Sequence, residues 1–328
     1  MTSLQLTLRT KALAAECGFG RCGIAAAEPL RRAEYLRNWI VSGRAGTMDY
    51  LGRWIDLRLD PRKLLPGARS VIVTAKVYRK EEISENSPDS DAALRGRVAR
   101  YAWGEDYHTV VRSDLKLLVE KLRAEFDEPF EAKICVDTAP LLERELAASA
   151  GIGWIGKNTL VLHPELGSYF FLGGVVTTLE MAPDKPEPDH CGSCTACLDA
   201  CPTGAFPAPY EMDASRCISY LTIEHRGAID ESLHSQMGDW VFGCDVCQEV
   251  CPFNAKAPQT RDPRFSIRSP GPRPQLTQIL DWSKDDYRIQ LSGSAMRRAK
   301  LEAWKRNARI ALRNLSADAS HPSSSEPA

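Results

Sequence analysis

Apolar side chains recur at two spacings along roughly the first 180 residues, one helical and one alternating. Intervals of three to four residues predict helices over residues 4–17, 30–41, 107–126 and 140–150. Alternating apolar and polar positions, or short apolar runs, predict strands over residues 19–25, 70–77, 132–136 and 169–180. Gly151 follows the last of these helices as its C-terminal cap. Alternation of strands and helices favours an α/β layer domain.

Changes in composition divide the rest of the chain. Residues 81–91 are acidic and serine-rich, which predicts an exposed loop, and residues 183–189 contain three prolines and predict a linker. One or two helices are expected between residues 276 and 315, and the polar residues 316–328 are not expected to fold. We therefore expect an α+β fold with domains at 1–182, 183–258 and 259–328.

The overall composition is that of an ordinary globular protein, with 328 residues, 43% apolar side chains and a net charge of −1. This length suits two or three domains. No apolar run reaches the roughly 18 residues of a membrane span. The N-terminus lacks a basic flank and an apolar segment, and the residues after Arg31-Arg32 are too polar for a twin-arginine signal. We expect a cytoplasmic monomer that does not contact a membrane.

Eight of the eleven cysteines lie between residues 190 and 254 and form two runs. The first run is Cys191, Cys194, Cys197 and Cys201, followed by Pro202. Its spacing matches the bacterial ferredoxin pattern for a 4Fe–4S cluster, whose fourth cysteine ligates the neighbouring cluster. Two-residue gaps let three thiolates converge from one tight loop onto three irons of a cube. This spacing predicts a ferredoxin-like domain with two clusters.

The second run begins at Cys217 and ends at Cys251-Pro252. The crossover of the ferredoxin pattern assigns one cluster to Cys191, Cys194, Cys197 and Cys251, and the other to Cys201, Cys217, Cys244 and Cys247. Between Cys217 and Cys244 lie 26 residues, which we interpret as an insertion with its own function. The alternatives are zinc, which usually binds paired short knuckles, and disulfides, which do not suit a chain without an export signal. Cys17, Cys22 and Cys135 are left over, as buried small hydrophobes.

An α/β domain joined to an electron relay implies redox chemistry on something that the first domain binds. No Gly-x-Gly-x-x-Gly turn opens a helix after a strand, so a Rossmann nicotinamide or flavin site is not supported. The glycine-rich residues 151–158 follow a helix instead. They are read either as a functional loop or as a plain loop whose glycines supply positive φ.

Five segments together resemble the epoxyqueuosine reductases, and the resemblance runs over nearly the whole chain. The segments are RYAWGEDYH at 100–108, VDTAPLLER at 136–144, GWIGKNT at 153–159, CISYLTIE at 217–224 and DVCQEVCPFN at 245–254. This family uses a cobalamin and two 4Fe–4S clusters to remove the epoxide oxygen of epoxyqueuosine at the tRNA wobble position. The resemblance implies that the mixed α/β domain at residues 1–182 binds cobalamin and substrate. It also implies an external electron donor.

The resemblance implies roles for individual residues. Asp137 matches the proton donor of the family. The positions expected to face the corrin, or to line the cofactor or the substrate, are Arg58, Trp103, Asp137, Lys157, Asn158, Ser168, Ser219 and Thr222. Placement alone leaves a helix-capping aspartate as the alternative for Asp137, and a helix-start pair packed on the core as the alternative for Tyr107 and His108. Because an acid that works near neutral pH must hold its proton, burial of Asp137 near the corrin is expected to raise its pKa above about 3.9.

The C-terminal region carries a concentration of positive charge that suits a tRNA partner. Between residues 293 and 315 the single acid Glu302 faces seven basic residues, namely Arg297, Arg298, Lys300, Lys305, Arg306, Arg309 and Arg313. Such a helix can follow the phosphates of a tRNA. The alternative is a solvated basic face.

Two other functions compete with this interpretation. A corrinoid reductive dehalogenase shares the combination of cobalamin and two clusters, but such enzymes typically carry a twin-arginine signal. A ferredoxin-like electron carrier would not need about 180 residues ahead of its clusters.

Overall fold

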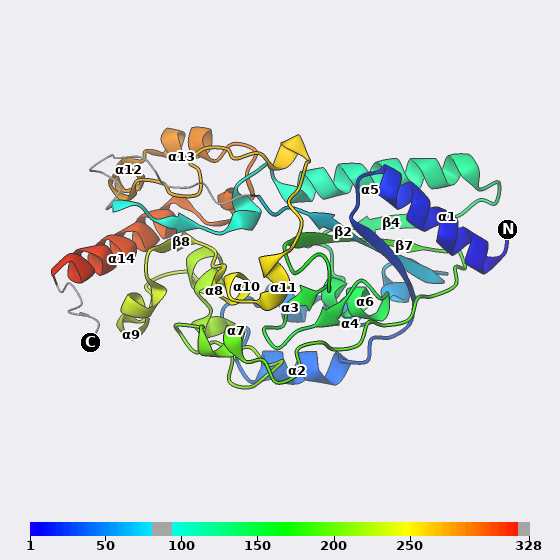
Figure 1. Cartoon of the computed structure of the whole chain (residues 1–328), viewed down its shortest axis with the longest axis horizontal. Coiled ribbons are helices and arrows are strands. Elements are labelled where there is room, and N and C mark those ends of the chain that lie inside the picture. Colours follow the sequence, from blue (N-terminus) through cyan, green and yellow to red (C-terminus); the bar gives the residue numbers. More distant parts are fainter. Residues whose placement is uncertain (81–93, 321–328) are drawn as a thin grey trace.

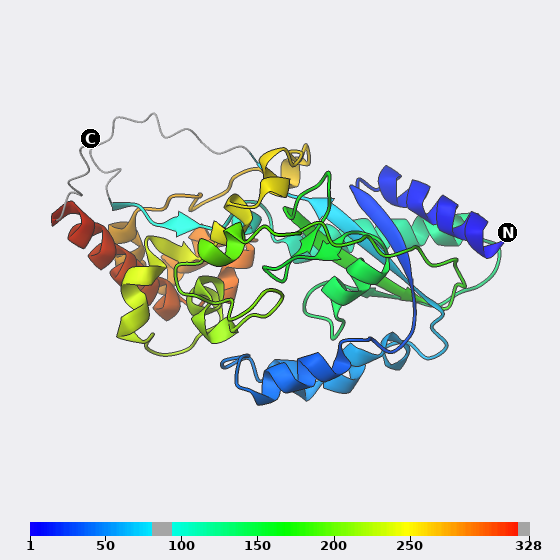
Figure 2. The same cartoon turned by 60° about the horizontal axis from the view of Figure 1, so that its bottom comes forward.

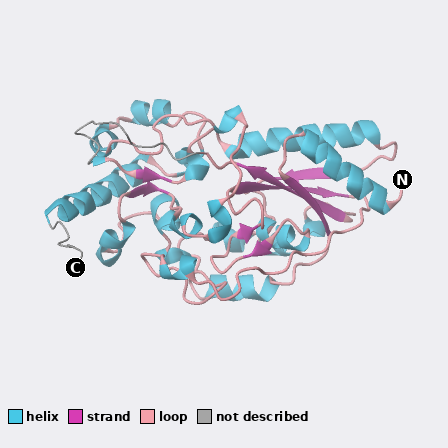
Figure 3. Ribbon diagram, viewed as in Figure 1, coloured by secondary structure: helices cyan, strands magenta, loops and turns pink. Residues whose placement is uncertain are grey.

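The computed structural model describes residues 1–80 and 94–320, and its largest element is a four-stranded sheet (Figures 1 and 3). The strands, in the order β1-β2-β7-β4, are β1 (Arg21–Ala26), β2 (Ser70–Val77), β7 (Phe170–Thr177) and β4 (Ala132–Cys135). Every neighbouring pair is antiparallel. The expected strands are therefore confirmed, but their pairing makes this an α+β domain and not the α/β layer that the alternation favours. The loop expected at 81–91 lies outside the described residues.

Three of the expected helices cover this sheet. They are α1 (Ser3–Glu16), α5 (Tyr107–Glu125) and α6 (Glu143–Ser149). The first two share a buried core with one face of the sheet, where Ile72 meets Leu115, and α6 shares a second core with the other face, around Val71. The end of α6 lies so close to β1 that a Cβ at Gly23 would come within 2.0 Å of the Ala150 carbonyl oxygen. Only glycine allows this approach.

A helical segment between β1 and β2 reaches away from the sheet (Figure 2). It contains α2 (Ala33–Val41), α3 (Tyr50–Arg53) and α4 (Ile55–Leu59), of which the sequence pattern predicts only the first. Neither α2 nor α3 has a buried residue. Trp39 Nε1 donates to the Met212 carbonyl oxygen at 2.5 Å, and the Thr47 amide donates to the Tyr220 hydroxyl at 2.8 Å. These bonds attach the segment to the cysteine-rich region.

The cysteine-rich region lies between the sheet and the C-terminal helices (Figure 1). Its elements are α7 (Ala196–Asp199), α8 (Ile218–Ile223), α9 (Glu231–His234), β8 (Trp240–Phe242), α10 (Val246–Glu249) and α11 (Pro252–Ala255). Helices α7 and α10, one from each cysteine run, pack against each other. The short pair β5 (Trp154–Ile155) and β6 (Val161–Leu162) lies against it through Trp154 and Cys251.

The C-terminal region forms its own core rather than a simple helix pair. It contains α12 (Leu276–Asp281), α13 (Lys284–Gln290), the 3₁₀ helix η7 (Ala295–Arg298) and α14 (Leu301–Ser320). This core also takes in β3 (Arg97–Val98), which pairs with β8 in parallel. Because α14 continues to Ser320, the expectation that residues 316–320 would not fold is wrong. In the described ranges, no helix is both long enough and apolar enough to cross a membrane.

Candidate functional site

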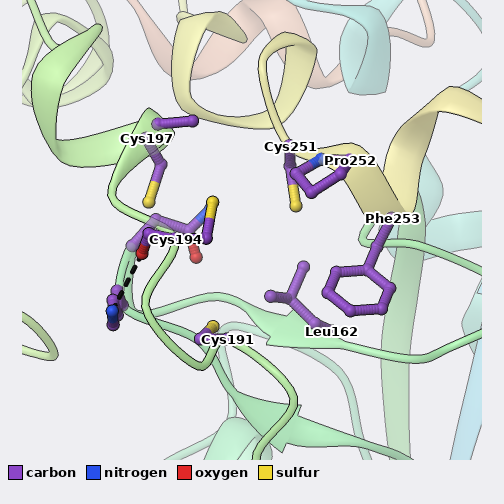
Figure 4. Close-up of a pocket in the computed structure, with 10 residues that line it drawn as sticks. Leu162, Cys191, Cys194, Cys197, Cys251, Pro252 and Phe253 are labelled. Atoms are coloured by element: carbon purple, nitrogen blue, oxygen red, sulfur yellow. Dashed lines mark hydrogen bonds between the residues drawn. The ribbon is translucent and has the colours of Figure 1, made fainter.

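Four cysteines from the two runs line one pocket (Figure 4). Cys191, Cys194 and Cys197 lie on one tight loop that continues into α7, and Cys251 is the N-cap of α11. Leu162, Pro252 and Phe253 also line this pocket. The fold thus brings together the four residues assigned from spacing to the first 4Fe–4S cluster.

The walls of this pocket suit an iron–sulfur cluster. Trp154 Nε1 donates to Cys191 Sγ at 3.4 Å, and the Trp154 ring meets Phe253 edge-on at 4.9 Å. Hydrogen bonds to cluster sulfurs and apolar surroundings both tune a cluster potential. Among residues 1–80 and 94–320, no group of His, Cys, Asp or Glu is arranged around a single metal ion. Four thiols around one pocket are the ligand set of a 4Fe–4S cluster.

The other four assigned cysteines lie close enough together for their charges to interact. Burial raises the pKa of Cys247 well above its ordinary value, and the neighbouring thiols Cys217, Cys244 and Cys201 raise it further. Burial also raises the pKa of Cys244, and the neighbouring thiols Cys217 and Cys201 add to this rise. Cys201 therefore lies with the second run although it belongs to the first, as the crossover predicts.

Lys157 and Asn158, for which a contact with a corrin is predicted, connect to the two cysteine loops in the structure. Lys157 Nζ donates to the carbonyl oxygens of Gly192 at 2.7 Å and Cys194 at 2.8 Å. Asn158 Nδ2 donates to the Cys247 carbonyl oxygen at 3.4 Å. Both side chains are buried, so they connect the sheet domain to the loops of both runs.

Ser168, Ser219 and Thr222 also make structural contacts to the cysteine-rich region. Ser168 Oγ accepts from Asn254 Nδ2 at 2.9 Å, directly after the second run. Thr222 is fully buried and accepts from the Gly243 amide at 2.9 Å. Ser219 directs its backbone N–H to the thiol two residues before it. These contacts order the cysteine loops, and the expected role of these residues beside the cofactor or the substrate stays a prediction.

Trp103 lies in the core of the C-terminal region. It is 7% exposed and packs in one cluster with Leu276 and Trp304. Its indole Nε1 donates to the Val98 carbonyl oxygen at 2.8 Å. The structure therefore gives Trp103 a packing role in this core, and its expected contact with a corrin stays a prediction.

Asp137 begins the segment between β4 and α6 in an unusual backbone conformation. Its φ is +45°, which is rare for a residue other than glycine. The Asp137 backbone amide donates a hydrogen bond to Glu143 Oε1 at 2.7 Å, which holds this turn. Because α6 starts only at Glu143 with Leu142 as its N-cap, the helix-capping alternative for Asp137 is wrong. Backbone strain of this kind is concentrated at functional sites.

A chain of hydrogen bonds leads from the start of α5 to Asp137. Asp106 caps α5 and lies 2.7 Å from His108 Nδ1, and His108 Nε2 lies 3.0 Å from Asp137 Oδ2. The Tyr107 hydroxyl also donates to Asp137, and its ring stacks on Phe171 at 4.4 Å. Tyr107 and His108 do start a helix, but their side chains belong to this site. The segment 100–108, which carries part of the resemblance, was the available signal.

These contacts set the charges at the site. Burial acts to raise the pKa of Asp137, but hydrogen bonds from His108 and Tyr107 outweigh it and lower this pKa. The rise expected from burial near the corrin stays a prediction for the protein with bound cobalamin. Burial opposes charge on His108, but Asp106 and Asp137 outweigh it and raise its pKa to about 9. The Asp137 side chain is 56% exposed, so a ligand can reach it.

Arg58 and Glu143 complete the surroundings of Asp137. Burial raises the pKa of Glu143 to about 8, and the charge of Asp137 adds to this rise, so Glu143 keeps a proton at neutral pH. Arg58, on α4, is 7% exposed, and its Nε has no hydrogen-bond partner among the described residues. Burial lowers the pKa of Arg58, while Tyr50, Asp137 and Glu143 oppose this effect. A buried donor without a partner is rare and calls for an explanation.

Arg298 reaches the same site from the C-terminal region. Its Nε and Nη2 bind the Glu224 carboxylate at 2.6 and 2.8 Å, and its guanidinium lies 5.5 Å from the centre of the Tyr50 ring. The positive charge of Arg298 also helps to lower the pKa of Asp137. Arg298 therefore forms an ion pair beside Asp137. From the sequence alone, it was one of the seven basic residues expected to follow the tRNA phosphates. No pattern along the chain signals this pairing.

The fold and the cysteines define the class of protein first. An α+β domain with an acidic site, joined to two groups of four cysteines, is typical of an iron–sulfur oxidoreductase. Residues 190–254 match the model of the 4Fe-4S double cluster binding domain. Residues 58–138 match the family described as Epoxyqueuosine reductase QueG, DUF1730.

Comparison with whole proteins then identifies the family. An epoxyqueuosine reductase of Xanthomonas campestris pv. campestris is 42% identical over 306 residues, covering 93% of this chain and 86% of the relative. The solved structure of an epoxyqueuosine reductase with an epoxyqueuosine-modified tRNA-Tyr stem loop matches with a TM-score of 0.87 and 32% identity, over 98% of this chain and 84% of the other. The Bacillus subtilis enzyme, solved with an aspartate catalytic loop swung out of the active site, matches with a TM-score of 0.86, 31% identity and the same coverage. The chain belongs to the epoxyqueuosine reductase family.

Proposed function

We propose that this protein reduces epoxyqueuosine in tRNA to queuosine, with electrons passing through two 4Fe–4S clusters to a bound cobalamin. One observation carries the proposal. Helix α8 starts directly after Cys217 and leads to Glu224, whose carboxylate holds Arg298 beside Asp137. Six helical residues span about 9 Å, so this short helix links a cysteine of the second group to the acidic site. Family membership favours this function over halide removal or simple electron carriage.

The residues around Asp137 fit a corrin. A corrin presents amide carbonyl oxygens and a phosphate, which are acceptors for the unpartnered donor of buried Arg58. Cobalamin supplies a cobalt centre that takes up single electrons and becomes strongly reducing. We assign Arg58 and the segment from Asp137 to Glu143 to its binding site. Lys157, Asn158, Ser168 and Thr222 contribute indirectly, because they order the cysteine loops.

The acidic site supplies the protons of the reaction. Conversion of an epoxide to an alkene breaks two carbon–oxygen bonds, consumes two electrons and two protons, and releases water. Asp137 is the exposed carboxyl group that can deliver a proton to the departing oxygen. Neutral Glu143 holds the Asp137 backbone, and the Arg298–Glu224 pair keeps a positive charge beside the carboxylate.

Electrons enter at the first group of cysteines. Cys194 is exposed, whereas burial raises the pKa values of Cys217, Cys244 and Cys247 in the second group. An external donor can therefore approach the loop around Cys194 most closely. The second group, next to α8, passes electrons on to the site of Asp137.

The tRNA is bound in part by one face of α14. Lys305, Arg309 and Arg313 are spaced four residues apart and share this face. Within the described residues, no ion pair or hydrogen bond involves their side-chain charges. Arg306 is different, because it donates to the carbonyl oxygens of Leu221, His225 and Gly227.

Replacing Lys305, Arg309 and Arg313 together by alanine is expected to weaken tRNA binding and its salt dependence. Each lost phosphate contact should reduce the slope of log affinity against log salt by about 0.7 to 0.9. Binding of an unmodified anticodon stem loop at several salt concentrations measures this slope. The matched control is Arg112→Ala, which removes one positive charge from α5 instead of from α14. An unchanged slope in the triple variant would make this surface a solvated basic face.

The proposed function is tested by incubating the cobalamin- and cluster-loaded protein with epoxyqueuosine tRNA and a chemical reductant. Nucleoside analysis should show queuosine, and omission of the reductant should abolish it. An absorption spectrum of the loaded protein should contain corrin bands as well as the broad cluster absorbance. Two bound clusters without corrin bands or conversion would instead indicate an electron carrier.

A further inference from the structure

We propose that His108 holds the proton that Asp137 passes to the substrate oxygen, so that the acid of the reaction is a pair of side chains. This inference rests on the proposed function and assigns a role to a residue that the sequence left open between a packing position and a ligand contact. Only Asp137 is reachable enough to meet the substrate directly, with 56% of its side chain exposed against 30% for His108.

The hydrogen bonds of His108 require a doubly protonated ring. Nδ1 lies 2.7 Å from Asp106 Oδ1 and Nε2 lies 3.0 Å from Asp137 Oδ2. An ionised carboxylate only accepts hydrogen bonds, so both ring nitrogens must donate. A neutral imidazole carries one N–H and would leave one of these contacts without a hydrogen. His108 therefore stores a proton directly behind Asp137.

Neighbouring groups fix the ring in this position. Asp106 is itself held at the start of α5, where it accepts from the His108 amide at 3.0 Å. The Tyr107 ring stacks against the imidazole at 4.1 Å with an angle of 27° between the planes. Because the carboxylate, the ring and the helix start form one rigid unit, the Nε2–H points at Asp137 before any ligand binds.

The charges around the pair keep the stored proton in place at neutral pH. On α5, Asp106 stabilises the imidazolium, and Asp137 does so from the neighbouring segment, which raises the pKa of His108 to about 9. From α6, Glu143 is neutral, with a pKa raised to about 8 by burial and by Asp137. Arg298 of η7 acts on Asp137 and favours its carboxylate form. The resting site is thus an imidazolium beside a carboxylate.

The proton transfer balances with the rest of the reaction. As a carbon–oxygen bond of the epoxide breaks, the Nε2 proton moves to the Asp137 carboxylate, and the carboxyl group gives a proton to the oxygen. His108 becomes neutral, and solvent reloads it through its exposed edge. A second passage supplies the other proton, and the oxygen leaves as water. The two electrons come from the external donor through the clusters.

The test compares His108→Gln with the wild type in single turnovers of loaded, reduced enzyme on epoxyqueuosine tRNA. The wild-type rate should be constant at neutral pH and fall as pH rises through about 9, because His108 then loses its proton. His108→Gln keeps a hydrogen bond to Asp137 but stores no proton. Its rate should be lower by about 10²-fold at neutral pH, with no fall near pH 9. The matched control His234→Gln changes a histidine on α9 whose ring Nε2 lies 3.0 Å from the Ile229 carbonyl oxygen.

A second variant separates a proton role from a packing role. His108→Ala should regain rate when imidazole is added, with a dependence on pH that follows the titration of free imidazole. A uniformly lower rate in His108→Gln that still falls near pH 9, or no rescue of His108→Ala, would overturn the relay while leaving the proposed function intact. Absence of queuosine with the wild type would overturn both.

Discussion

Asp137→Asn is expected to lower the single-turnover rate of epoxide reduction by roughly 10²–10⁴-fold, which is the usual contribution of general acid catalysis. Asparagine keeps the size of the side chain and can still accept from His108 Nε2, now 3.0 Å from Asp137 Oδ2. It cannot pass a proton on. The loss should appear in the chemical step, measured with prereduced enzyme and saturating tRNA, because the substitution leaves the cysteine loops and α14 untouched.

A matched control is available for this substitution. Asp230 is the N-cap of α9 and accepts from the Ser232 amide at 2.9 Å, so Asp230→Asn should retain both the cap and the activity. Iron content and tRNA affinity should match the wild type in both variants. If Asp137→Asn turned over at nearly the wild-type rate, neutral Glu143 or a water molecule would have to be the proton source.

The main elements of the sheet domain could be predicted because their signals are local. The eight apolar residues of β2 and the long amphipathic pattern of α5 each identify an element without knowledge of the rest of the chain. Strand direction is different, because it depends on which strands become neighbours. The alternation of helices and strands, which favours parallel pairing, therefore did not give the strand directions: β2 lies between β1 and β7 and is antiparallel to both, as in the expected α+β class.

The sequence indicated several residues of the site, but it did not indicate which atoms those residues contact. The resemblance indicated that Lys157 and Asn158 matter, but it did not say which atoms they touch. Their partners are backbone carbonyl oxygens of cysteine loops 35 or more residues further along the chain. His108 was left open between site and core because its partner Asp137 is 29 residues away. Contacts at such distances in sequence exist only after folding.

Charge on the C-terminal helix shows the same limit. The sequence contains seven basic residues in this region. In the structure, Arg298 is paired with Glu224 and Arg306 donates to the Leu221 carbonyl oxygen, so neither is free to bind a phosphate. The remaining face of Lys305, Arg309 and Arg313 follows directly from helical periodicity. Periodicity therefore predicts which side chains share a face, and not which of them already have partners.

The cysteine spacing, in contrast, predicted a long-range arrangement, because a cluster restricts its ligands to one small volume. Cys251 lines one pocket together with Cys191, Cys194 and Cys197. Cys201 is among the groups that raise the pKa of Cys247 in the other run. The crossover is therefore testable by pairing variants from different runs.

Cys201→Ala and Cys247→Ala are expected to remove one and the same cluster, and Cys194→Ala and Cys251→Ala the other. Wild-type protein reconstituted without oxygen should bind about eight irons, and each variant about four. Electron paramagnetic resonance of the reduced proteins should give one spectrum for the first pair of variants and a second spectrum for the other pair. Queuosine formation should be lost in all four, because electrons must cross both clusters to reach the site of Asp137.

The control for these four variants is Cys22→Ala, which removes a thiol of β1 that lies outside both groups. Cys22 lies on β1 and packs beside the buried core of the sheet domain, so its thiol is not required by either cluster. Cys22→Ala should therefore keep about eight irons and wild-type turnover. Matching spectra for Cys201→Ala and Cys194→Ala, which belong to the same run, would mean that each run holds its own cluster. An iron content near four in fully reconstituted wild-type protein would contradict the presence of two clusters altogether.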